Sequence, residues 1–151
     1  MKIYFILLPL LLTACTHRGA FNEFHITKKQ KLSIEELQST KIKDTKNNAN
    51  GLVAVLYLNK VDKKEFHTKE YFYVSLYKQN ETNSKPTFLL NNKQPITIKK
   101  LPQHNRFTKL TSLNAAWLQN YMVIFKKEQG ALKFQVKENN SSSKVLLFQQ
   151  N

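Results

Sequence analysis

The stretch Leu52-Val53-Ala54-Val55-Leu56-Tyr57-Leu58 decides the fold class of this chain. Apolar residues occupy both its odd and its even positions, which is typical of a β-strand buried on both faces. The next apolar stretch, Tyr71-Phe72-Tyr73-Val74-Ser75-Leu76-Tyr77, alternates instead. Its even positions are aliphatic or Phe, and its odd positions are three tyrosines and a serine, so its two faces differ. Together they predict a β-sheet with a second layer packed on it.

Further short apolar segments follow, each bounded by polar turns, and Asn91-Asn92 is a candidate tight turn between two of them. We interpret these segments as strands over residues 87–90, 95–101, 121–125, 132–137 and 145–148. About seven strands at short spacing favour an antiparallel β-sandwich, immunoglobulin-like or transthyretin-like, and a small closed barrel is the alternative.

One or two short helices are also expected. In Leu32-Ser33-Ile34-Glu35-Glu36-Leu37, Ser33 and Glu36 have the spacing of a capping box, which predicts a helix over residues 34–40. Asn114 can cap a helical turn over residues 114–118. We expect Trp117, within that turn, to lie in the core.

The N-terminal segment predicts an exported protein. The apolar run over residues 3–12 has about half the ~20 residues that a membrane-spanning helix needs, and it ends in small residues, as a secretory signal does. Leu12-Thr13-Ala14-Cys15 resembles a bacterial lipobox, and Cys15 is the only cysteine. The resemblance implies cleavage before Cys15 and a palmitate-type lipid anchor on it. Thr16, rather than Asp, follows the cysteine, which implies the outer membrane and, by expectation, its periplasmic face.

These features divide the chain into three parts. Residues 1–14 are the signal peptide, residues 15–31 the lipidated N-terminus and tether, and residues 32–151 a single domain. No other cysteine is present, so the domain must be held together by packing rather than by disulfides.

The chain is strongly basic, with 24 Lys and Arg against 10 Asp and Glu. Between residues 85 and 137 the only acid is Glu128. For an exported protein this favours acidic glycans, lipopolysaccharide, lipid head groups or acidic proteins over nucleic acid. The candidate binding residues are Lys99, Lys100, Arg106, Lys126 and Lys127. The alternative is that these lysines merely solubilise the surface.

The face formed by Tyr71, Tyr73 and Tyr77 is a second binding candidate, because tyrosine is enriched at interface hot spots. The alternative is that it packs under a loop or under the helix over residues 34–40. Asn140 lies in a glycosylation acceptor pattern, with Glu138 two positions before it.

No pattern of a catalytic site is found. The four histidines do not occur at metal-ligand spacings, and no nucleophile elbow, phosphate loop or calcium loop is present. We therefore expect no enzyme activity, no cofactor and no metal.

Part of the chain resembles the type VI secretion outer-membrane lipoprotein family, which is TssJ-like. The matching residues are Tyr57-Leu58, Phe66, Tyr71-Phe72, Leu76-Tyr77 and the strand over residues 121–125. The resemblance implies a transthyretin-like sandwich that docks through loops onto an inner-membrane secretion component. The sequence thus predicts a non-enzymatic anchor or assembly factor of an envelope complex, with a surface-exposed adhesin or glycan binder as the alternative.

Overall fold

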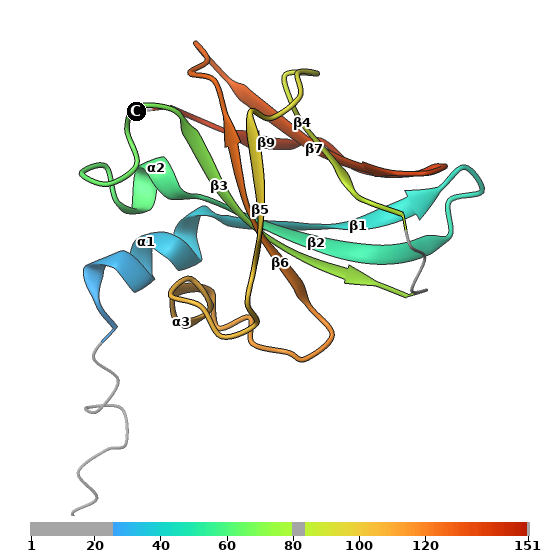
Figure 1. The fold of residues 1–151 in the computed structure, drawn as a ribbon, viewed down its shortest axis with the longest axis horizontal. Helices are drawn as coiled ribbons and strands as arrows, with labels where there is room; N and C mark the ends of the chain where they lie inside the picture. Colours follow the sequence, from blue (N-terminus) through green and yellow to red (C-terminus); the bar gives the residue numbers. More distant parts are fainter. Residues whose placement is uncertain (1–25, 80–83, 151) are drawn as a thin grey trace, which may run out of the picture.

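The computed structural model describes residues 26–79 and 84–150 (Figure 1). The predicted signal peptide and Cys15 lie outside the described residues. The elements in chain order are α1 (Lys28–Glu36), β1 (Leu37–Asp44), β2 (Ala49–Tyr57), α2 (Leu58–Val61), β3 (Glu70–Lys78), β4 (Thr87–Leu90), β5 (Thr97–Leu101), α3 (Thr108–Thr111), β6 (Gln119–Phe125), β7 (Leu132–Glu138), β8 (Ser141–Ser143) and β9 (Leu146–Phe148). None of the helices in this part of the chain has the length and apolar character needed to cross a membrane.

The strands form an antiparallel sheet, which confirms the predicted mainly β class. Their order is β4-β7-β8-β1-β2-β3-β6-β5, and β9 pairs with β7 beside this path. The described residues contain nine strands rather than about seven. The two additional strands are β1, where a helix was expected, and β8, where a polar loop was expected.

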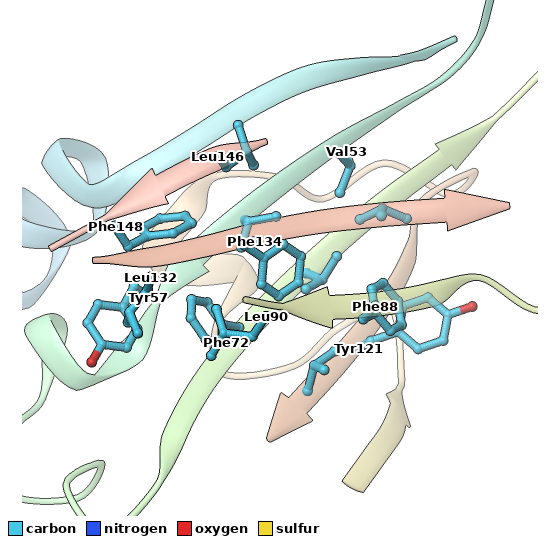
Figure 2. Packing of buried hydrophobic residues seen from close by; sticks show 14 of the residues in the cluster. Val53, Tyr57, Phe72, Phe88, Leu90, Tyr121, Leu132, Phe134, Leu146 and Phe148 are labelled. Carbon is cyan, nitrogen blue, oxygen red and sulfur yellow. The ribbon is translucent and has the colours of Figure 1, made fainter. Parts of the chain in front are cut away.

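The sheet curls so that its distant strands pack against one another. Phe134 on β7 lies over Phe72 on β3, with ring centroids 4.9 Å apart, and Phe88 on β4 lies 5.4 Å from Tyr121 on β6 (Figure 2). These residues belong to one buried cluster that joins β4 and β7, at one end of the strand order, to β3 and β6 near the other end. The apolar positions of β7 are fully buried, as their alternation predicted.

A second, smaller core covers the opposite face of β2 and β3. It contains Leu56, Leu58, Val61, Phe66, Tyr73 and Phe107. Val53 to Tyr57 are therefore buried on both faces, as the first stretch predicted. The same holds for Phe72 to Leu76, where the alternation had suggested one apolar and one polar face.

The helix predicted over residues 34–40 is wrong in both its start and its end. Helix α1 begins after Thr27, whose hydroxyl accepts from Gln30 N at 3.2 Å while Gln30 Oε1 accepts from Thr27 N at 2.8 Å. Ser33 is buried inside the helix, and its hydroxyl donates to the carbonyl of Lys29. Residues 37–43 instead pair with β2, because the backbone hydrogen bonds to a buried strand outweigh the local capping signal.

The second predicted helical turn and the place of Trp117 are also wrong. A short helix forms earlier in the chain, at α3. Residues 115–118 form only a tight turn, in which Leu118 N donates a hydrogen bond to Ala115 O at 3.0 Å. Trp117 is 67% exposed rather than buried. The sequence signal at Asn114 is thus that of a turn, not of a helix.

The tight turn at Asn91-Asn92 is confirmed. Both residues have positive φ, 50° and 64°. The backbones of Leu90 and Lys93 exchange two hydrogen bonds across the turn. The strands on either side do not form a hairpin, however. Strand β4 pairs with β7 and β5 pairs with β6, so the turn sends the chain from one end of the strand order to the other.

Candidate functional site

An open groove of about 840 Å³ lies between α1, α2 and the segment that follows α2. It is lined by Lys28, Lys29, Leu32, Lys60, Val61, Asp62, Lys63, Lys64 and Glu65. Five lysines against two carboxylates leave the groove with a formal excess of three positive charges. Helix α1 and helix α2 lie side by side at this end of the molecule (Figure 1).

A smaller hollow of about 220 Å³ adjoins the groove, because Lys60 and Lys63 line both. His67, Lys127 and Gln150 line it further, together with Tyr57, Asn59 and Phe66. The basic surface therefore continues from α1 across the segment after α2 to the end of β6. Such a surface attracts anionic groups.

The lysines of the groove divide into paired and unpaired residues. Lys29 forms an ion pair with Asp62, and Lys60 forms one with Glu36 at 2.8 Å. Lys28, Lys63 and Lys64 are exposed, and no carboxylate of the described ranges, 26–79 and 84–150, pairs with them. These three ammonium groups are the ones open to an external anion.

Asp62 shapes the segment that presents Lys63 and Lys64. Its carbonyl accepts from Glu65 N at 3.2 Å and from Phe66 N at 2.9 Å, which folds the segment into a turn. The hydrogen bond from Lys29 lowers the pKa of the Asp62 carboxyl below its usual value. Asp62 is therefore ionised at neutral pH and joins the turn to α1.

The far end of this turn is anchored by aromatic packing. Phe66 is buried, with its ring 5.2 Å from Tyr71 and 6.2 Å from Phe107. Arg106, predicted to bind an anion, lies 4.7 Å above the ring of Phe107, and its Nη1 donates to Glu65 Oε2 at 3.0 Å. Arg106 thus neutralises Glu65 and helps to fix the turn.

Sequence reasoning missed a buried carboxylate, Glu70, beside the smaller hollow. Glu70 has no exposed surface. Its Oε2 accepts from the Tyr57 hydroxyl at 2.6 Å, and its Oε1 accepts from Gln150 Nε2 at 2.8 Å and from Glu128 N at 3.2 Å. Lys127, another predicted binding residue, pairs with it at 3.2 Å. The one sequence signal for Glu70 was its position directly before an apolar strand. That position does not reveal whether the strand end is buried or lies in solvent.

The three tyrosines of the predicted binding face do not form one exposed stripe. Tyr73 is fully buried, with its ring 5.2 Å from Phe107 and its hydroxyl donating to Asn120 Oδ1 at 3.0 Å. Tyr71 is partly buried against Phe66, and only Tyr77 is exposed. The first two tyrosines lie under α2, α3 and their flanking loops, and so help to hold the groove in place.

The remaining predicted residues lie on separate parts of the surface. Lys99 and Lys100 are exposed neighbours on β5, at one end of the strand order, and Lys126 is exposed just after β6. Of the predicted basic set, only Lys127 lines either hollow. Asn140 is exposed in the turn between β7 and β8.

In the part of the chain that the structure describes, no three His, Cys, Asp or Glu side chains gather where they could hold a metal ion. Compared with known proteins, the chain matches no family model, no curated protein and no solved structure.

Proposed function

We propose that this chain is a lipid-anchored outer-membrane lipoprotein that acts, without enzyme activity, as an anchor or assembly factor in an envelope or secretion complex. The observation that carries the proposal is the sequence Leu12-Thr13-Ala14-Cys15 at the end of a short apolar run. The domain is assigned, in the same proposal, to the β-sandwich class, immunoglobulin-like or transthyretin-like. The packing of Phe134 over Phe72 supports that assignment.

A binding role fits the chemistry of the described residues better than a catalytic one. The buried carboxylate of Glu70 is occupied by several donors from the protein itself, so it is engaged in holding the fold. The open groove, in contrast, offers three exposed and unpaired ammonium groups. A surface of this kind recognises an anionic partner through charge.

The anchor is tested by comparing the natural chain with the Cys15→Ser variant, and with Thr16→Ser as a matched control that keeps the cysteine. We expect the natural chain and the control to incorporate labelled palmitate and to remain in the membrane pellet after a high-salt wash. Cys15→Ser should lose the label. Label on the Cys15→Ser variant, or none on the natural chain, would overturn the lipid anchor.

A surface-exposed adhesin or binder of acidic glycans is the second candidate, and the exposed lysines favour it. Treating intact cells with a protease that does not cross the membrane separates the two. Protection in intact cells with digestion after lysis would support a periplasmic assembly role and justify cross-linking to find the partner. Digestion in intact cells would instead support the adhesin.

A further inference from the structure

We propose that Lys28, Lys63 and Lys64 bind the phosphate groups of anionic lipids in the membrane to which the chain is anchored, so that the domain rests with its groove against that membrane. The inference rests on the proposed lipid anchor. It adds a second attachment point to the membrane. The lipid anchor determines where the domain is located, and the lysines determine how the domain is oriented there.

The first support is the position of the groove relative to the proposed anchor. Ten residues lie between Cys15 and Ile26, where the described chain begins, and the eleven Cα-to-Cα steps from Cys15 to Ile26 span at most about 40 Å. Lys28 follows Ile26 by two residues and already lines the groove. The groove is therefore at the end of the domain nearest to the anchor along the chain.

The second support is that other basic residues of the protein pair with the acids of the groove, so that three groove lysines have no carboxylate partner among the described residues. Asp62 is paired with Lys29, and Glu65 is paired with Arg106. Neither acid is thus left to compete for Lys28, Lys63 or Lys64. Ammonium groups bind phosphate as compact point charges, and each basic residue near an anionic bilayer adds to the attraction within about 8 Å at physiological ionic strength.

The third support is apolar surface on the same segment. Leu32 lines the groove, and Ile26, two residues before Lys28, is 59% exposed, while the buried residue of α1 is the polar Ser33. Lysines interspersed with exposed aliphatic residues are typical of segments that lie at the boundary between head groups and acyl chains. An acidic protein would not require an exposed isoleucine two residues before Lys28.

The experiment measures vesicle binding without the lipid. The full chain carrying Cys15→Ser is mixed with phosphatidylcholine vesicles, with or without phosphatidylglycerol, and the ratio of the two partition constants is determined by sedimentation. This ratio cancels any contribution of the apolar run over residues 3–12. The test variant adds Lys28→Gln, Lys63→Gln and Lys64→Gln, and the control adds Lys99→Gln, Lys100→Gln and Lys133→Gln, which are exposed and outside the groove.

We expect the test variant to lower the ratio by about 10- to 100-fold and the control to lower it by less than about threefold. Circular dichroism establishes that both variants are folded. Equal losses in both variants would overturn the proposal in favour of general charge attraction. Absence of any preference for phosphatidylglycerol, with lysine-dependent binding to soluble polyglutamate, would overturn it in favour of an acidic protein partner. The ratio is independent of Cys15, so this test and the palmitate test fail separately.

Discussion

The hydroxyl of Tyr57 donates a hydrogen bond of 2.6 Å to Oε2 of Glu70 at the end of the core, where the carboxylate has no exposed surface. Tyr57 is the last residue of β2 and Glu70 the first of β3, so this bond joins the two ends of the segment that contains α2 and the turn with Lys63 and Lys64. Gln150 and Glu128 bring the C-terminal residues and the end of β6 to the same carboxylate. One buried side chain therefore connects three segments beside the smaller hollow.

Replacing Glu70 with Gln should destabilise the fold by about 2–4 kcal/mol, because an amide nitrogen faces donors that need an acceptor. The variant Tyr57→Phe removes one donor and leaves the others in place, so we expect a loss of about 1–2 kcal/mol. Urea unfolding with linear extrapolation measures both values. Equal stability of Glu70→Gln and the natural chain would contradict the role given to this carboxylate.

The same pair predicts a loss of stability at alkaline pH. Burial, and then the hydrogen bond to the Glu70 carboxylate, raise the pKa of Tyr57 far above its ordinary value. The unfolded chain releases this proton near pH 10 while the native state keeps it, so the free energy of unfolding is unaffected below that pH and falls above it. Tyr57→Phe should flatten the decline between about pH 10 and pH 11. The surface variant Tyr77→Phe serves as the control, and the same slope in both variants would reject the explanation.

The sequence was sufficient to predict β2 and β3, because their apolar residues report burial directly. It was insufficient for β1, in which Ile42 is the only buried residue and the remaining positions are polar or half-exposed. That strand forms because its backbone hydrogen-bonds to β2. The helix was misplaced for a related reason, since Thr27 with Gln30 and Ser33 with Glu36 are two competing capping boxes, and only pairing in three dimensions selects the first.

The groove was even less accessible to sequence reasoning. The charge pattern drew attention to residues 85–137, whereas the groove takes its lysines from residues 28–64. Whether a lysine is open to a partner depends on which acid folds next to it. Lys29 and Lys63 look alike in the sequence, but the first is paired with Asp62 and the second has no such partner in the described chain.

Gly51 should not tolerate a side chain. A Cβ at this position would lie 2.5 Å from the carbonyl oxygen of Tyr77, in the strand beside it. We expect Gly51→Ala to cost about 1–3 kcal/mol, since the backbone of two paired strands must shift. Gly130→Asn is a suitable comparison, because its φ of 78° is one that Asn adopts and no heavy atom lies within 4 Å of a Cβ there. Thermal unfolding that lowers Tm equally in both variants would argue against close strand packing at Gly51.

Glu65 offers a change that should strengthen anion binding rather than weaken it. It is one of two acids in the groove, and it holds Arg106 in an ion pair at the surface. Glu65→Gln removes a negative charge from the groove and frees the guanidinium, so the preference for phosphatidylglycerol over phosphatidylcholine vesicles should rise by about two- to fivefold. Glu35→Gln, at an exposed position of α1 outside the groove, changes the net charge equally and should have a smaller effect. If both variants raise the preference to the same extent, net charge rather than the groove governs binding. A larger rise for Glu65→Gln would locate the interaction at the turn that carries Lys63 and Lys64.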